Sequence, residues 1–288
     1  MRLDDEEGSS NIEDRRGQSG GLGFGGRGMS LGTFAIVAVI ALAFGINPMT
    51  ILGGGPLAPS NQQIGQPQQP ADPARPASEA DSFVAKVLRT TERSWETIFA
   101  NEISQPYQPP RLVLFAGNVQ SGCGAAQSAM GPFYCPADSK IYLDQSFFDE
   151  LSRRFGAPGD FAAAYVIAHE VGHHVQNLLG ISGEAQAAQQ RASETRANAI
   201  SVQVELQADC LAGVWAKDNA RRLEPGDVAE AMRAAAAIGD DTLQRAAQGV
   251  VVPESFTHGS SAQRTKWFMR GMTLGTVAGC DTFSAGAP

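Results

Sequence analysis

The sequence predicts an α+β domain that is mostly helical and contains a small β-sheet. Residues 164–179 repeat apolar side chains at helical spacing, and Gly180 follows where a helix ends. Two short runs, 111–115 and 140–144, have the apolar or alternating pattern of β-strands. After Gly180 the chain returns several times to helical spacing. Helices should therefore form most of the domain.

The overall composition is that of a globular protein with one sizeable core. The chain has 288 residues, of which 43% are hydrophobic and 18% charged, and its net charge is −8. This acidic balance argues against a nucleic acid partner, because phosphate backbones attract basic surfaces. The four cysteines are a small even number. They fit two disulfides in an oxidising compartment.

Three segments precede the domain. Residues 1–28 end in a glycine-rich stretch and are expected to form a disordered cytoplasmic tail. Residues 29–52 contain an apolar stretch long enough to cross a bilayer once, so we expect a transmembrane signal-anchor helix. Residues 53–80 are rich in Pro, Gly and Gln and should form an extended linker. Residues 81–288 form the folded domain.

The basic residues give the expected orientation of the anchor. Several arginines precede the apolar stretch, and the next basic residue after it is Arg75. The positive-inside rule then places the N-terminus in the cytoplasm and the domain in the periplasm or outside the cell. A cleaved signal peptide is the alternative, because Ala41-Leu42-Ala43 has the form of a cleavage site. Both interpretations export the domain.

The pattern His169-Glu170-x-x-His173 lies in the predicted helix 164–179. A spacing of four residues puts both histidines on one face, where they can bind Zn²⁺ at about 2.0–2.1 Å. Glu170 is turned by about 100°, so it can act as a general base on water without binding the metal. The alternative is a buried helix with hydrogen-bonded histidines. His174 points off the metal face and is expected to be a packing or supporting residue.

A catalytic zinc needs a third protein ligand and an open position. Glu205 and Asp209 lie four residues apart on the predicted helix 194–219, and Glu205 has apolar neighbours. A carboxylate in such surroundings needs a partner, and a metal ion is one. We expect Glu205 to be the third ligand and Asp209 to accept the free N–H of a ligating histidine. The two roles could be exchanged, or both carboxylates could face solvent.

His258 is the one histidine far from the helical motif, and it lies in a predicted loop. Its functional interpretation is catalytic, as a hydrogen-bond donor to the oxyanion formed during peptide hydrolysis. The alternative is a loop histidine in a structural hydrogen bond. Arg264 is a weaker candidate for the same role. The acidic pair Asp240-Asp241 is expected to form a turn or a helix cap.

The four cysteines allow three pairings. We favour Cys123 with Cys135, which closes a local loop, and Cys210 with Cys280, which ties the C-terminal part to the Glu205 helix. The sequence has no C-x-x-C pattern. A zinc site made of four cysteines is therefore not expected.

The predicted sheet comes just before the metal-binding helix in the sequence. Zinc peptidases use an edge strand in this position to bind the substrate backbone as an added strand. Tyr134 and Tyr142 would then either line the cleft or pack in the core.

Several stretches of the chain resemble the predicted neutral zinc metallopeptidases of bacteria, which are single-pass, membrane-anchored proteins. These stretches are GPFYCPADSKIYLD, AHEVGHHVQNLLG, ELQADCLAGVWA, AIGDDTLQ, VVPESFTHGSSAQR and GCDTF. The resemblance implies a zincin-like fold and membrane anchoring. It also implies zinc bound by His169, His173 and Glu205, with Glu170 catalytic. It implies no particular substrate.

These observations lead to one expected function and two alternatives. We expect a membrane-anchored, zinc-dependent endopeptidase that hydrolyses a protein or peptide outside the cytoplasmic membrane. One alternative is a zinc-containing scaffold or binding protein of the cell envelope without catalytic activity. The other is a hydrolase of cell-wall peptides.

Overall fold

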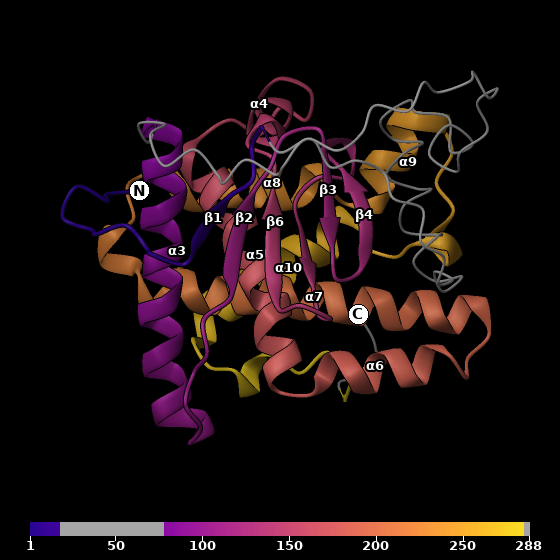
Figure 1. Ribbon diagram of the computed structural model, residues 1–288. Helices are drawn as coiled ribbons and strands as arrows, with labels where there is room; N and C mark the ends of the chain where they lie inside the picture. Colours follow the sequence, from indigo (N-terminus) through magenta and orange to yellow (C-terminus); the bar gives the residue numbers. More distant parts are fainter. Residues whose placement is uncertain (18–77, 285–288) are drawn as a thin grey trace, which may run out of the picture.

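The computed structural model describes residues 1–17 and 78–284 (Figure 1). The expected anchor, residues 29–52, and nearly all of the expected linker lie outside these ranges. Within the described residues, no helix has both the length and the apolar character needed to cross a bilayer. The described part is mostly helical with small sheets, which confirms the α+β class, and the zincin-like fold implied by the resemblance stays a prediction.

The strands form two small sheets. A four-stranded sheet has the order β1-β2-β6-β5, and a separate hairpin pairs β3 with β4. The bounds are β1 Ile12–Asp14, β2 Arg111–Leu114, β3 Asn118–Ser121, β4 Gly124–Gln127, β5 Phe133–Cys135 and β6 Lys140–Leu143. The strands expected near residues 111–115 and 140–144 are confirmed as β2 and β6. The loop expected between them contains β3, β4 and β5.

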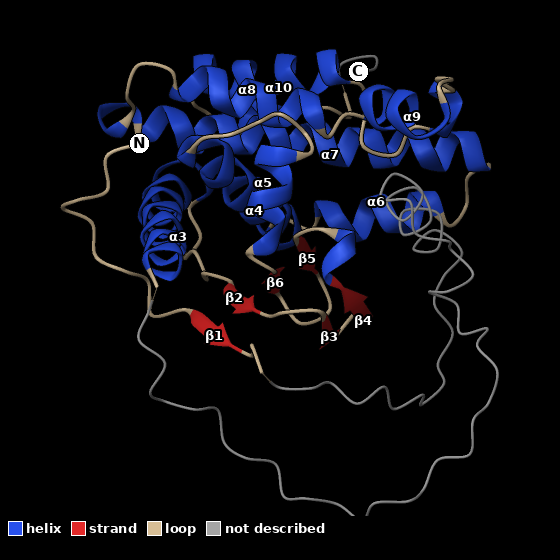
Figure 2. Cartoon of the chain, turned by 90° about the horizontal axis from the view of Figure 1, so that it is seen from above, coloured by secondary structure: helices blue, strands red, loops and turns tan. Residues whose placement is uncertain are grey.

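The helices cover one face of the four-stranded sheet. Their bounds are α3 Glu79–Ile98, α4 Ser146–Arg153, α5 Asp160–Leu178, α6 Ile181–Gln189, α7 Glu194–Asp218, α8 Asp227–Ala237, α9 Asp240–Gln248 and α10 Ser261–Leu274. Figure 2 shows the strands along one side of the molecule and α7, α8 and α10 along the opposite side, with α5 between them. The metal-motif helix is therefore central.

Alternation along the strands divides the apolar side chains between two clusters. Leu112 and Leu114 of β2 join the main core beneath the helices. Val113, between them, points to the other face and packs in a smaller cluster with Phe115 and Tyr142. This follows from the two-residue period of a strand. The sheet thus contributes to both cores.

The expectation of a disordered tail is wrong for residues 1–17. β1 pairs in parallel with β2, and Ile12 lies opposite Leu112. Leu3 is buried in the main core, and the buried Glu6 forms ion pairs with Arg93 and Arg222. These partners lie far away in the sequence. Local composition, which is polar and acidic, therefore does not reveal that this segment is folded.

Glycines allow α7 and α10 to pack with their backbones in contact. A Cβ atom on Gly271 would lie 1.8 Å from the carbonyl oxygen of Cys210, and one on Gly213 would lie 2.1 Å from that of Phe268. Only glycine permits such an approach. The Cys210–Cys280 disulfide is formed beside this contact. The expected pairing is confirmed, because Cys123 also pairs with Cys135.

Candidate metal centre

Two helices bring the expected zinc ligands together. His169 and His173 come from α5, and Glu205 comes from α7. The helices approach closely because a Cβ on Gly172 would lie only 2.9 Å from the carbonyl oxygen of Ala208. The two histidine Nε2 atoms are 3.2 Å apart. The Glu205 carboxylate oxygens lie 3.3 Å from His169 Nε2 and 3.5 Å from His173 Nε2.

The spacing of these donor atoms fits a zinc ion. Ligand atoms bound tetrahedrally at about 2.0–2.1 Å from zinc lie about 3.3–3.4 Å from one another. The two Nε2 atoms are 3.2 Å apart, and the Glu205 carboxylate approaches them to 3.3 Å through Oε2 and to 3.5 Å through Oε1, all close to that value. Two imidazoles and one carboxylate are also a ligand set of catalytic zinc sites, which keep one position open. The residues present therefore suit zinc.

The other ring nitrogen of each histidine has a polar partner. His169 Nδ1 lies 2.9 Å from Asp209 Oδ1, and His173 Nδ1 lies 2.8 Å from Gln176 Oε1. These acceptors favour a proton on Nδ1 and leave the Nε2 lone pair for a metal. Gln176 was not expected from the sequence. Its position three residues after His173, on the same helical face, is the signal that could have identified it.

Asp209 is held in a buried charged network. Arg264 donates to both carboxylate oxygens, at 2.9 and 3.0 Å, and the Tyr165 hydroxyl donates to Oδ1. Burial raises the pKa of Asp209. The charges of Arg264 and His169 lower it by more, so the pKa falls below its ordinary value. The carboxylate therefore stays ionised. Arg264 is only 1% exposed, and its guanidinium group is hydrogen-bonded to Asp209. It is therefore not placed to bind the oxyanion, the role considered for it from the sequence.

Glu170 is buried next to the ligands. It comes from the same helix as both histidines and is 8% exposed. Burial raises its pKa, and the neighbouring charge of Glu205 acts in the same direction, although His173 and His169 oppose the shift. A carboxylate with a raised pKa is a stronger base toward water than a solvated one. This position suits a general base.

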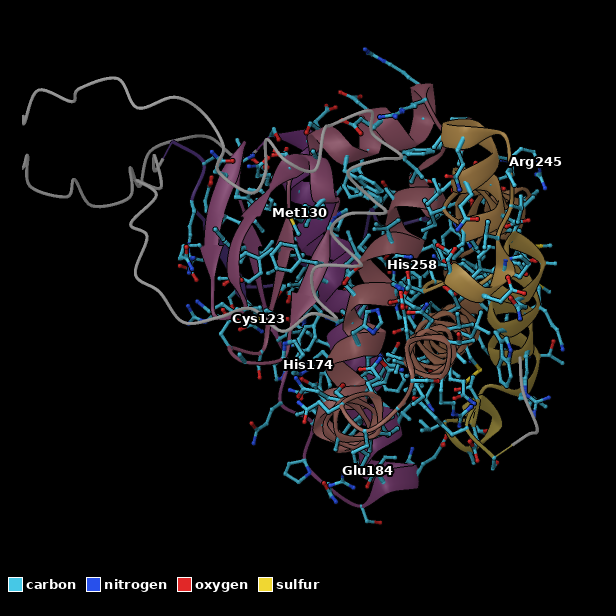
Figure 3. All side chains as sticks on the ribbon, turned by 90° about the vertical axis from the view of Figure 1, so that its right-hand side faces the viewer. Cys123, Met130, His174, Glu184, Arg245 and His258 are labelled. Carbon is cyan, nitrogen blue, oxygen red and sulfur yellow. A yellow bond between two sulfur atoms is a disulfide. The ribbon has the colours of Figure 1, made fainter. Side chains whose placement is uncertain are left out.

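His258, labelled in Figure 3, lies in the loop before α10, and its side chain is 16% exposed. Its Nδ1 lies 3.3 Å from Asp240 Oδ1. Burial lowers the pKa of His258, but Asp240 and the nearby charge of Glu205 raise it to a value above the ordinary one. Glu205 thus acts electrostatically on the His258 ring. The sequence-based interpretation of His258 as a donor near the site therefore stays a prediction with a suitable environment.

Asp240 organises the loop that carries His258. Asp240 is completely buried, and its Oδ2 accepts hydrogen bonds from the backbone N–H groups of Thr257, His258 and Gly259. Asp240 is the first residue of α9, directly after the N-cap Gly239, and not the turn or cap that was expected. The sequence did not indicate the contact with His258, because Asp240 and His258 do not belong to the same helix or strand.

His174 has a different role from its neighbour His173. Its Nδ1 lies 3.0 Å from the Tyr134 hydroxyl, and its Nε2 lies 2.6 Å from the carbonyl oxygen of Gln108. It thereby joins α5 to β5 and to the loop before β2. Tyr142 is 1% exposed and stacks on Phe133, so it packs in the core.

Within the described residues, a second cluster of carboxylates is formed by Asp160, Asp227 and Glu230. The Met1 ammonium group contacts Asp160 at 3.0 Å and Asp227 at 3.1 Å. Glu230 accepts a hydrogen bond from the backbone N–H of Phe161. The chain itself therefore supplies the partners of this group, and we assign no metal to it.

Comparisons with known proteins agree with this chemistry. Residues 1–283 match the family model described as "Putative neutral zinc metallopeptidase". The protein YpfJ of Escherichia coli K12 is 46% identical over 98% of this chain and 99% of its own length. A Mycobacterium tuberculosis protein is 41% identical over 85% of both chains. No solved structure matches. The chain belongs to this family.

Proposed function

We propose that the protein is a zinc-dependent endopeptidase, with zinc held by His169, His173 and Glu205. The observation that supports this most strongly is the proximity of the two histidine Nε2 atoms and the Glu205 carboxylate, whose closest separations are near the ligand spacing of tetrahedral zinc. A structural zinc site normally has four protein ligands. The described residues offer three at this site, which favours the catalytic function over an envelope scaffold.

Glu170 is the general base in this proposal. Zinc, when bound, polarises the peptide carbonyl and lowers the pKa of the attacking water toward about 7. Glu170 takes a proton from that water and later passes it to the leaving amine. Burial supports this role, because it raises the pKa of Glu170 above its ordinary value. The raised pKa makes Glu170 a stronger base toward the attacking water.

His258 donates a hydrogen bond to the oxyanion. Asp240 Oδ1 lies 3.3 Å from His258 Nδ1 and raises the pKa of the ring, which favours the form with a proton on both nitrogens. A protonated Nε2 can donate to the negative oxygen that develops during attack. Asp240 acts through His258, because it fixes the position of both the ring and its backbone.

The substrate backbone binds beside β5. In the described part of the sheet, β5 is the outermost strand on the side away from β1. It contacts α5, and Tyr134 of β5 shares hydrogen bonds with His174 and Asn177 of that helix. An extended peptide can add to such an edge through main-chain hydrogen bonds. This would place a peptide next to the metal-binding helix.

The two disulfides support a location in an oxidising compartment outside the cytoplasm. Membrane attachment through residues 29–52 stays a prediction, because these residues lie outside the described ranges. A substrate held near a membrane surface would be consistent with such attachment.

The decisive variant for this function is Glu170→Gln in the full-length protein. It removes the base and keeps the size of the side chain, so we expect bound zinc but a fall in peptide hydrolysis of about 100-fold or more. Glu184→Gln, on the exposed part of α6, is the matched control. Casein and purified peptidoglycan peptides, used as substrates in parallel, separate protein cleavage from cell-wall cleavage. Hydrolysis by Glu170→Gln at the wild-type rate would contradict the proposal.

A further inference from the structure

The residues on either side of 18–77 lie next to each other in the fold. Arg16, just before the undescribed residues 18–77, donates to Asp81 Oδ1 at 2.7 Å and to Oδ2 at 3.0 Å. Asp81 is in the first turn of α3, where Ser78 caps the helix. The side chains of Arg16 and Asp81 are only 16% and 11% exposed. A largely buried ion pair thus joins the two ends of this segment.

Backbone pairing fixes the N-terminal segment to the sheet. The Leu112 N–H donates to the carbonyl oxygen of Asn11, and the Arg15 N–H donates to that of Leu114, both at 2.8 Å. The Glu13 carboxylate accepts from Lys140 Nζ at 2.9 Å. These bonds require β1 and β2 to lie in direct contact.

The rest of the segment fits buried groups of the domain. Glu92 of α3 is 2% exposed and accepts hydrogen bonds from Ser9 and from Asn11. Glu6 lies 2.7 Å from Arg222, and Leu3 is part of the main core. Both apolar and charged surfaces of the domain are therefore complementary to residues 1–17. The family match also begins at residue 1.

This docking is incompatible with a single membrane crossing between the two parts. A crossing needs about 20 apolar residues. Residues 29–49, the only uncharged, largely apolar stretch of that length in the sequence between Gly17 and Ser78, suffice for one crossing and not for two. One crossing would place β1 and β2 on opposite sides of the bilayer and would break every contact described above.

We propose that residues 1–17 and the zinc-binding domain lie on the same side of the membrane, docked as one folded unit. This replaces the orientation expected from the positive-inside rule, in which the N-terminus and the domain are separated. The inference rests on the docked N-terminal strand and is independent of the proposed peptidase activity.

Cysteine labelling in cells tests this topology. Asp4→Cys and Glu184→Cys, made separately in the full-length protein, place thiols at exposed sites in the N-terminal segment and on α6. Spheroplasts are treated with a membrane-impermeant maleimide before and after the membrane is opened with detergent. The unsubstituted protein is the control, because Cys123 is exposed and would label if its disulfide were reduced.

We expect both thiols to label under the same conditions, either both in intact spheroplasts or both only after detergent. If Glu184→Cys labels in intact spheroplasts and Asp4→Cys labels only after detergent, the proposal is wrong. Hydrogen exchange on the purified full-length protein gives a second measurement. The peptide spanning residues 9–17 should exchange far more slowly than an unfolded peptide. Exchange at the unfolded rate would also overturn the docking.

Discussion

The metal centre and the N-terminal strand are built in opposite ways. The ligands of the metal centre come from two helices, and the residues that support it repeat at intervals of three or four, as His173 does after His169 and Asp209 after Glu205. β1 instead depends on partners such as Leu112 and Lys140, which are far away in the sequence. Helical periodicity therefore identifies the site, whereas only the folded structure identifies the strand.

The two regions should also differ in whether they contribute to catalysis or to the stability of the fold. The metal centre buries ionised groups, such as Asp209 and Arg264, whose desolvation offsets much of their attraction. The N-terminal segment adds apolar burial through Leu3 and main-chain hydrogen bonds. Changes at the centre should thus alter catalysis or zinc affinity, and changes in the segment should alter stability. Four experiments test this separation.

Among these four experiments, the largest effect is expected from His258. His258→Ala removes the proposed oxyanion donor and should lower kcat by about 100-fold, with little change in KM or zinc content. Asp240→Asn should lower kcat by a smaller factor, because it acts only through the position and charge of His258. The double variant should resemble His258→Ala alone. Fully additive losses would show that Asp240 acts independently of His258.

A smaller effect is expected when a histidine loses its partner. Gln176→Ala removes the acceptor of His173 Nδ1 and should weaken zinc binding by about 10–100-fold, as measured by competition with a chelator. Gln203→Ala is the matched control, since this buried glutamine bonds to Thr282 and to no histidine. Equal losses of zinc affinity in both variants would show that packing, not the histidine contact, is responsible.

The N-terminal segment should affect stability instead. Leu3→Ala removes a buried side chain and should lower the free energy of unfolding by about 2 kcal/mol. Leu274→Ala, at a position that is 48% exposed, should cost well under half of that. Urea unfolding of the full-length protein measures both values. An unchanged stability of Leu3→Ala would indicate that the segment is not docked in solution.

The smallest effect is a pH dependence at Glu13. Hydrogen bonds from Arg15 and Lys140 outweigh the effect of burial and lower the pKa of Glu13 to about 2. Because the pKa in the folded state is below the unfolded value of about 4.3, the ionised carboxylate stabilises the fold above that pH. This stabilisation is lost as the pH falls toward 2.

The matching measurement compares wild type with Glu13→Gln. The difference in their free energies of unfolding should be about 1 kcal/mol or less at pH 7, since the pair is partly exposed to solvent. It should shrink as the pH is lowered from 5 to 3. A difference that grows on acidification would contradict the assignment of the ion pairs to Glu13.

Much of the helical structure and the donor set of the site follow from the sequence. The spacing of His169 and His173 is set by the period of one helix, and Glu205 reaches them because α7 packs closely against α5. Gln176 and the contact of Asp240 with His258 were missed for different reasons. Gln176 has a readable helical spacing, whereas Asp240 meets His258 only because the start of α9 packs on the loop before α10.

The N-terminal strand could not be predicted from local pattern. Its acidic and basic residues look like a solvated tail until their partners, among them Arg93 and Asp81 of α3, are placed beside them. The Gly-rich stretch that follows separates it from the domain in sequence but not in the fold. Pairings between distant segments depend on surfaces that periodicity does not describe.

The central claim is that three side chains from α5 and α7 form one zinc site. The most direct test is the zinc content of purified full-length protein, since residues 1–17 are part of the folded unit. We expect about one zinc per chain in the wild type and none in Glu205→Ala after dialysis, with Glu184→Ala as a control that keeps its zinc. A wild type that takes up no zinc, or a Glu205→Ala variant that binds zinc as tightly as the wild type, would contradict this site.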